Sequence, residues 1–452
     1  MPVAFATTEQ LLISGDDSRL QLDADHGCNH YLCRPQPDPD LLKLGSSTAS
    51  TISTAGFAIA DQLRNQLAEE VHQHAPEQVY AEHAARIRQH IRQLCGLDDC
   101  ADASTAITLT ESGTASHGCA LAVLQADYPD QAWTVLMVDA AETGRGVPAA
   151  LCPPGQVVEC AEIAIRDAGG MPLAADVIDA DVRARTEMAI MQGNMVLLVM
   201  VDQSKSGCIA PSLSCALDLR HRFPDQVHLL LDACQFRFST FTLRSYLDHG
   251  IMVAITGSKF LAAPSFAAAL FIPQSTAALP EARNHPGLLL RWQIALATWQ
   301  AFEDLDAAKV HRFMQSCAQA IQQRLEADCA FSSLSAPPLH RNSASTAWDA
   351  VPTIFPFLLR LPSAGDSPVH ASYASTLEIF QRLQQTGKPR IQLGRPIHAG
   401  QDSAGRKLGA LRLCISAPMI VDAITHHHLQ QSIHQIIHAL DRIAITDLSL
   451  LR

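Results

Sequence analysis

The chain has 452 residues, of which 48% are hydrophobic and 17% are charged, and its formal net charge is -12. A chain of this length and apolar content can bury a substantial core, and its length predicts two or three structural units. The acidic balance leaves no basic surface for phosphate backbones or anionic lipid, so we expect neither a nucleic-acid nor a membrane partner.

Short apolar runs in the middle of the chain are predicted to be buried strands, because they are continuous rather than alternating. These runs are Ile107–Thr110, Trp133–Asp139, Val196–Asp202, Val227–Asp232, Met252–Thr256 and Ala267–Ile272. Helical links are expected at His117–Ala126, Pro211–Arg222 and Leu243–His249. This alternation predicts an α/β fold in which helices cover both faces of a mostly parallel sheet.

The pattern changes after Pro273. A long helical stretch is expected over Leu288–Ala327, a linker or loop over Ser332–Ala350, strands at Thr353–Leu361, Ile391–Leu393 and Leu411–Ile415, and a final helix over about Val421–Ile443. We therefore predict an N-terminal arm over residues 1–60, a large domain over 61–285, and an interdomain helix with a smaller C-terminal α+β domain over 286–452.

The first candidate site element is Ser112-Gly113-Thr114, where a predicted strand passes into a helix. Free backbone N–H groups and the helix dipole favour a phosphate dianion at such a place. Gly113 lets the backbone approach closely, and Thr114 can add a hydroxyl. Taken alone, the motif is also typical of an ordinary helix N-cap.

The second element is Asp232-Ala233-Cys234-Gln235, in which an acid ends an apolar strand. A carboxylate buried there needs a cationic partner, and a protonated pyridine nitrogen is one. Gln235 is placed to hydrogen-bond a 3-hydroxyl on the same ring. The structural alternative is an Asp that caps the following helix.

The third element is Thr256-Gly257-Ser258-Lys259, a lysine directly after an apolar strand. Burial there lowers the pKa of a lysine, which is what Schiff-base formation needs. Thr256 and Ser258 can donate hydroxyls to a phosphate. A lysine that extends its amine to solvent is the alternative when the residue is viewed singly.

Together the three elements resemble the class V aminotransferase and cysteine desulfurase group of fold-type I enzymes, which use pyridoxal 5′-phosphate (PLP). That group has a Ser-Gly-x-Thr-like turn, then Asp-Ala-x-Gln, then Ser-Lys or His-Lys. The resemblance covers roughly residues 110–273 and extends loosely beyond them. It implies the PLP-dependent transferase fold: a three-layer αβα large domain with a mostly parallel seven-stranded sheet, a small C-terminal domain, and a homodimer with active sites near its interface.

Further roles follow from this resemblance. Arg412, in the run Ala410–Ala417, matches the arginine that grips the substrate carboxylate; an exposed arginine on an edge strand is the alternative. Gln203 is expected on the 3-hydroxyl side of the cofactor. The turn Ala141–Gly146 lacks the aromatic residue that usually stacks on the ring, so either another segment supplies it or Glu142 or Thr143 lies over the ring.

Three further sequence features bear on function. Between Ala330 and Arg412 there is no cysteine, which disfavours a persulfide route to desulfuration. Gly144–Ala149 fits G-x-G-x-x-A, but no strand-ending acid follows about 20 residues later, as a dinucleotide site requires. On a helix, His434 and His438 share a face without an acidic partner, so we expect no metal site.

Cysteine usage and the termini bear on location. The 13 cysteines are odd in number and are interpreted as reduced thiols. The longest apolar stretches fall short of the ~20 residues that cross a bilayer. Residues Met1–Gln10 lack Lys, Arg and a long apolar block, so they do not resemble a secretory signal. We expect a cytoplasmic protein.

The sequence thus predicts a PLP-dependent enzyme that acts on an amino acid or amine, by aminotransfer. A β-lyase or desulfurase-like reaction is the alternative, and a PLP-fold binding protein without turnover is a third reading. Lys259 and Asp232 are the expected catalytic residues, and Arg412 is the expected substrate ligand. The expected cofactor ligands are Gly113, Thr114, Glu142, Thr143, Gln203, Asp232, Gln235, Thr256, Ser258 and Lys259.

Overall fold

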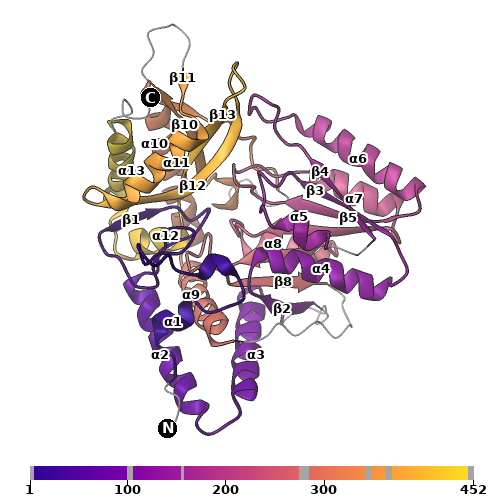
Figure 1. Cartoon of the computed structure of the whole chain (residues 1–452), viewed down its shortest axis with the longest axis horizontal. Coiled ribbons are helices and arrows are strands. Elements are labelled where there is room, and N and C mark those ends of the chain that lie inside the picture. The colour runs from indigo at the N-terminus through magenta and orange to yellow at the C-terminus, as the bar shows by residue number, and fades with distance from the viewer. Residues whose placement is uncertain are drawn as a thin grey trace.

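Two sheets form the framework of the chain (Figure 1). The structure is a computed structural model and describes residues 5–98, 105–153, 157–273, 285–341, 348–361 and 369–445. The larger sheet belongs to the middle of the chain. The smaller sheet combines C-terminal strands with one strand from near the N-terminus.

The larger sheet has seven strands in the order β2-β8-β7-β6-β5-β3-β4. β8 is antiparallel to both neighbours, and every neighbouring pair from β7 to β4 is parallel, so the expected mostly parallel sheet is confirmed. The strands are β2 (Ala106–Thr110), β3 (Trp133–Val138), β4 (Val158–Ile163), β5 (Met195–Val201), β6 (Val227–Ala233), β7 (Met252–Thr256) and β8 (Ala268–Ile272).

β4 is the strand that the apolar runs did not predict. It lies at the edge of the sheet and pairs with β3 alone. It carries Glu159 and Glu162, and most of its residues are partly or fully exposed. An edge strand that faces solvent mixes polar with apolar residues, so a search for continuous apolar runs passes over it.

Helices cover both faces of the larger sheet because alternate residues of a strand point to opposite sides. Leu197 of β5 packs in the same cluster as Leu121 of α4 and Leu151 of α5. Leu198 packs on the other side, with helices α6, α7 and α8. The three-layer αβα arrangement is therefore confirmed. The helices are α4 (Gly113–Asp127), α5 (Val147–Leu151), α6 (Ala175–Met191), α7 (Leu213–Arg222) and α8 (Thr240–Asp248).

The smaller sheet has the order β1-β12-β13-β10-β11, and β9 pairs with β10. Its first strand comes from the N-terminal part of the chain and runs parallel to β12. Helices α10 to α13 lie beside this sheet (Figure 1). The elements are β1 (Leu41–Leu44), β9 (Phe331–Ser333), β10 (Ile354–Leu361), β11 (Val369–His370), β12 (Arg390–Gln401), β13 (Lys407–Cys414), α10 (Ala307–Ala327), α11 (Tyr373–Gln385), α12 (Ala417–Thr425) and α13 (Leu429–Ala444).

The N-terminal helices pack against α9 (Pro286–Glu303), the helix that links the two sheets. They are α1 (Thr8–Leu12), α2 (Thr54–Glu70) and α3 (Pro76–Leu94), and short 3-10 helices lie at Ser18–Leu20 and Trp348–Ala350. Residue 60, the expected end of the N-terminal arm, falls inside α2, and the expected interdomain helix begins with α9. The domain boundaries themselves stay a prediction.

Two expected helices are each divided in the structure. The stretch Leu288–Ala327 is interrupted at Asp304–Asp306, where Asp306 caps α10 by accepting a hydrogen bond from the N–H of Lys309 at 2.8 Å. The final helix is interrupted at His426–His428, where His427 has a φ of 57°. Apolar periodicity continues across both breaks, so it could not locate them. Among the described residues, no helix is long and apolar enough to cross a membrane.

Candidate active site

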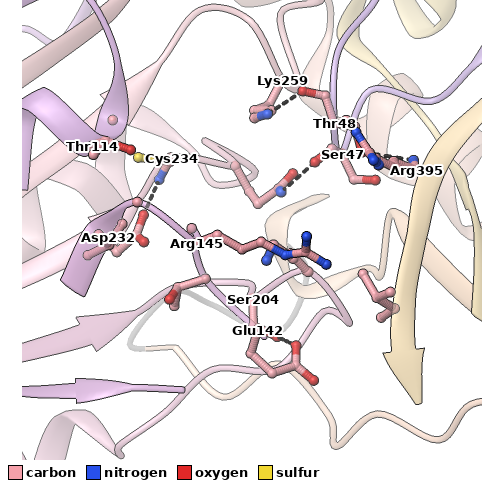
Figure 2. Close-up of a pocket in the computed structure, with 18 of the residues that line it drawn as sticks. Ser47, Thr48, Thr114, Glu142, Arg145, Ser204, Asp232, Cys234, Lys259 and Arg395 are labelled. Carbon is pink, nitrogen blue, oxygen red and sulfur yellow. Dashed lines mark hydrogen bonds between the residues drawn. The ribbon is translucent and has the colours of Figure 1, made fainter. Parts of the chain in front are cut away.

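A cavity of about 590 Å³ lies at the carboxyl ends of β3, β5, β6 and β7, the edge at which parallel sheets usually bind ligands. Residues from the N-terminal segment and from the smaller sheet close its other side. Every residue predicted for the site lines it: Gly113, Thr114, Glu142, Thr143, Gln203, Asp232, Gln235, Thr256, Ser258, Lys259 and Arg412. Figure 2 shows several of these side chains converging from separate segments.

The N-terminus of α4 forms a cradle beside the end of β6. Ser112 is the N-cap, and its Oγ accepts a hydrogen bond from the N–H of Ala115 at 3.2 Å. The N–H groups of Gly113 and Thr114 have no partner within the helix, and they lie at its positive end. A Cβ on Gly113 would lie 2.4 Å from Sγ of Cys234, so glycine is required for this close approach.

Asp232 is the penultimate residue of β6 and is buried next to His117, a histidine that the sequence motifs did not indicate. Oδ2 of Asp232 lies 3.5 Å from Nε2 of His117, and Oδ1 accepts a hydrogen bond from the N–H of Cys234 at 3.1 Å. Burial favours the neutral acid, but His117 and the Cys234 N–H outweigh it and lower the pKa of Asp232. The same pairing outweighs burial at His117 and raises its pKa. Asp232 is therefore held as a carboxylate.

Lys259 follows β7, and its Nζ donates a hydrogen bond to the carbonyl oxygen of Thr48 (Figure 2). Burial, followed by the positive charge of Arg412, lowers the pKa of Lys259 to about 8. An ordinary lysine has a pKa of about 10.4. The amine of Lys259 is therefore much more often neutral near pH 7, which is the form that attacks a carbonyl.

Two glutamines of the cavity contact Arg237. Nε2 of Gln235 donates to the carbonyl oxygen of Ser47 at 3.0 Å, and its Oε1 accepts from Nε of Arg237 at 3.1 Å. Nε2 of Gln203 donates to the carbonyl oxygen of Arg237 at 3.4 Å, and Gln203 has a φ of 57°. Gln203 thus occupies the left-handed region, which is costly for glutamine and is often associated with functional sites.

The hydroxyls expected to hold a phosphate stand at the end of β7. Oγ1 of Thr256 donates to the carbonyl oxygen of Cys234 at 2.7 Å, and the Oγ of Ser258 lies 3.5 Å from that Oγ1. Cγ2 of Thr256 would also lie 3.5 Å from a Cβ placed on Gly113. The cradle of α4 and the end of β7 are therefore neighbours, as a shared phosphate site requires.

Glu142 and Thr143 line the cavity, but their polar groups are bonded to the chain. The Glu142 carboxylate accepts from Nε of Arg166 at 2.9 Å and from the hydroxyls of Ser204 and Ser206 at 2.7 Å each. The hydroxyl of Thr143 donates to the carbonyl oxygen of Val138 at 3.3 Å. These bonds fix the turn after β3 to the turn after β5, and a position over the cofactor ring stays a prediction for both residues.

Arg412 lies in β13 and is 2% exposed. Its Nη2 donates to Oγ1 of Thr48 at 2.7 Å and to the carbonyl oxygen of Arg395 at 2.6 Å, and its Nη1 donates to the carbonyl oxygen of Lys205 at 3.3 Å. It is therefore a buried cation at the cavity wall rather than an exposed residue of an edge strand, and β13 has a partner on each side.

The cavity also contains residues that the motifs did not indicate. They include Arg19, His30, Tyr31 and Thr48 from the N-terminal segment, Tyr373 from α11, and Arg395 and His398 from β12. His117 had one available signal, since it follows Gly113 by one helical turn and so shares its face of α4. The others lie far from the motifs in sequence, and only the folded chain brings them to the site.

A pyridoxal phosphate would match the groups in this cavity. Nε2 of His117 has no hydrogen bond within normal limits, and the adjacent Asp232 retains acceptor capacity for a ring N–H. The cradle at Gly113 and Thr114 offers unpaired N–H donors to a phosphate. The amine of Lys259 shares the cavity with both groups. The chemistry of this donor set fits the cofactor that the sequence predicts.

No protein-family model matches the chain, and no curated protein matches its sequence. Solved structures do match. The cysteine desulfurase CsdA from Escherichia coli superposes with a TM-score of 0.53 at 16% identity, over 89% of this chain and 94% of that chain. The cystine C-S lyase C-DES, in complex with its reaction product cysteine persulfide, gives 0.54 at 14% identity, over 88% and 97%.

A TDC from Oryza sativa, determined with PLP, superposes with a TM-score of 0.53 at 14% identity, over 88% of this chain and 84% of that chain. At such identities the likeness establishes the fold. The chain therefore has the PLP-dependent transferase fold, as its sequence motifs indicated.

Proposed function

We propose that this protein is a PLP-dependent enzyme that acts on an amino acid, and that its reaction is aminotransfer. The observation that carries the proposal is the meeting of Lys259, Asp232 and the Gly113–Thr114 cradle in one cavity. The fold supports it, because solved structures with this fold include one determined with PLP.

Bound PLP would supply an electron sink for the negative charge that develops at the substrate Cα. The residues of the chain then have separate tasks. The carboxylate of Asp232 keeps a proton on the ring nitrogen, and His117 keeps that carboxylate ionised. The N–H groups of Gly113 and Thr114, with the hydroxyls of Thr256 and Ser258, hold the phosphate.

Lys259 and Arg412 act on the substrate side in this proposal. With PLP and substrate bound, the neutral amine of Lys259 would accept the proton of the substrate Cα. Arg412 holds the substrate carboxylate and so fixes which bond at Cα is aligned for cleavage. Gln203 and Gln235 are proposed to contact the 3-hydroxyl, and Glu142 and Thr143 to shape the space over the ring.

A β-lyase reaction is the second candidate, favoured by the fold shared with the C-S lyase C-DES. It would use the same Lys259 base. A persulfide route has less support. Among the described residues that line the cavity, Cys234 is the single cysteine. Burial, together with the charge of Asp232, raises the pKa of its thiol well above 9.0. A thiol in this state is a poor nucleophile.

The first test is covalent capture. The protein incubated with PLP and reduced with borohydride should carry a cofactor mass adduct on the peptide that contains Lys259. Absence of that adduct would overturn the proposal. Addition of single amino acids then separates the two reactions: transamination leaves an aminated cofactor that a keto acid restores, whereas a lyase releases ammonia and a keto acid without a co-substrate.

The assembly is also part of the proposal. We expect a homodimer with the cavity near the subunit interface, in the cytoplasm. Sedimentation equilibrium of the purified protein measures the first of these, and a monomer at micromolar concentration would contradict it.

A further inference from the structure

The cavity carries more positive than negative charge. Six of its lining residues are cationic and two are carboxylates: Arg19, Arg145, Lys205, Lys259, Arg395 and Arg412 against Glu142 and Asp232. Both carboxylates already have cationic partners, since Glu142 is bonded to Arg166 and Asp232 lies beside His117. The surplus therefore cannot be neutralised within the cavity wall.

Some of the cations also have an assigned partner or role. Nε of Arg19 donates to Oδ1 of Asp17 at 2.8 Å. Lys259 is the proposed cofactor lysine, and Arg412 is the proposed ligand of the α-carboxylate. Arg145, Lys205 and Arg395 remain, and among the described residues no carboxylate lies within 4.0 Å of any of these three.

These three cations line one cavity, and the backbone carbonyl oxygens of Lys205 and Arg395 both accept hydrogen bonds from Arg412. The side chain of Arg145 extends into the cavity from the turn after β3 (Figure 2). Burial lowers the pKa of Lys205 to about 8, and the charges of Arg412 and Arg145 contribute to this. Burial also lowers the pKa of His30, with contributions from the charges of Arg395 and Arg145.

The bonds that these side chains make are to neutral partners. Nζ of Lys205 donates to the carbonyl oxygens of Ala140 and Ala141 at 3.0 Å each, which leaves one of its three N–H groups. Nη1 of Arg395 contacts Nε2 of His30 at 2.5 Å. Within the described chain, the guanidinium of Arg145 has no hydrogen-bond partner.

A histidine completes the cluster. His398 lines the cavity and stacks on Tyr373 with ring centroids 4.1 Å apart, and its Nδ1 is buried without a hydrogen-bond partner. Burial, Lys407 and Arg145 lower the pKa of His398, so the ring is neutral and can donate one N–H. His398 can therefore add an N–H donor beside cations that bond only to neutral groups, and such a set of donors favours an anion.

We propose that Arg145, Lys205, Arg395 and His398 bind an acidic group on the side chain of the substrate, so that the enzyme acts on amino acids with a second anionic group. This inference rests on the proposed function. The α-carboxylate goes to Arg412, and the side-chain acid goes to the cluster around Arg145. The class comprises amino acids that end in a carboxylate or a sulfur oxyacid.

These cations could instead bind the phosphate group of the cofactor. Its cradle lies at Gly113 and Thr114, where Gly146 also packs: a Cβ on Gly146 would lie 3.4 Å from Cγ2 of Thr114. The Arg145 backbone is therefore near the cradle, whereas its charge acts on His30, Lys205 and His398. This favours the substrate side for its guanidinium.

The test compares ligands that differ by one charge. In the PLP-loaded protein, amino-acid binding is followed as a change in the absorbance spectrum of the cofactor. Aspartate and glutamate should give half of this change at concentrations about 10- to 100-fold lower than asparagine and glutamine do, because they make one more charged hydrogen bond. Arg145→Gln should bring this ratio close to one. Arg312→Gln, which changes an exposed arginine on α10, should leave it unchanged.

A second readout needs no cofactor. Succinate should raise the melting temperature of the protein more than butyrate at equal concentration, and Arg145→Gln should remove the difference. Equal binding of acidic and neutral amino acids by a protein that does form the Lys259 adduct would overturn the inference alone. If Arg145→Gln instead binds PLP more weakly and keeps the preference for acidic over neutral amino acids, the inference is also overturned, because Arg145 then binds the cofactor phosphate. Absence of the PLP adduct on Lys259 would instead contradict the proposed function.

Discussion

The two walls of the cavity are assembled in different ways. The wall on the larger sheet takes its residues from turns at the ends of its strands, and the turns after β2, β6 and β7 each carry a short motif. The facing wall takes Thr48 from the N-terminal segment and Arg395 and Arg412 from the smaller sheet. The first wall can be recognised in local sequence, whereas the second exists only once distant segments have met.

The first wall is proposed to hold the cofactor, and the second is proposed to hold the α-carboxylate of the substrate through Arg412. Variants should therefore separate loss of cofactor chemistry from loss of substrate recognition. The largest effect is expected for Lys259→Ala, which should abolish the borohydride-fixed adduct and leave PLP held by non-covalent contacts alone. Mass spectrometry measures the adduct, and Lys309→Ala, at an exposed lysine, is the control. An adduct at wild-type stoichiometry in Lys259→Ala would contradict the assignment.

Asp232→Asn should give the next largest effect. The adduct should still form, but turnover should fall by about 10³-fold, because a preorganised charge opposite the ring nitrogen is lost. Steady-state kinetics and adduct mass measure the two properties in parallel. Asp248→Asn, at an exposed acid on α8, should change neither. Near-normal turnover in Asp232→Asn would show that another group supports the ring.

Arg412→Met tests the facing wall. The concentration of amino acid that half-saturates the enzyme should rise about 10- to 100-fold, as expected for loss of a charged hydrogen bond. The final yield of the borohydride-fixed adduct at saturating PLP should be unchanged. A primary amine without the α-carboxylate should bind wild type and variant equally, which separates carboxylate binding from damage to the fold. Equal losses for both ligands would point to the bonds of Arg412 with Thr48 and Arg395 instead.

The smallest effect concerns pH. Only the neutral amine reacts with PLP, and burial lowers the pKa of Lys259 to about 8. The rate of adduct formation should therefore rise about tenfold per pH unit up to pH 8 and then level off. Stopped-flow absorbance measures this profile. A rate that still rises tenfold between pH 9 and pH 10 would indicate an ordinary lysine.

The contrast between the walls also marks how far sequence alone could go. Continuous apolar runs such as those of β5 and β6 predicted the buried strands, because strands covered on both faces have no polar alternation. The motif that begins at Asp232 lies at the end of β6 and the motif that ends at Lys259 lies at the end of β7, and all the predicted site residues line one cavity. The edge strand β4 escaped prediction because it mixes charged with apolar residues.

The rest of the site depends on tertiary structure. Nothing near Glu142 in sequence indicates its ion pair with Arg166 or its bonds to Ser204 and Ser206, which join two separate turns. His117 is an ordinary helix residue until the end of β6 is placed beside it. The cations around Arg145 likewise indicate an anion site because no carboxylate of the described residues lies beside them, and sequence alone does not show which charges are neighbours.

The pairing of β1 with β12 has a consequence for biosynthesis. Leu41 aligns with Arg390 and Leu44 with Leu393. During translation β1 is therefore synthesised long before β12, the strand with which it pairs. Thr48, whose carbonyl oxygen meets Lys259, follows β1 closely. A ribosome-bound chain therefore has the lysine and the phosphate cradle well before it can close the facing wall. Contacts so distant in sequence form slowly, and the cofactor pocket should be completed only after translation has passed β12.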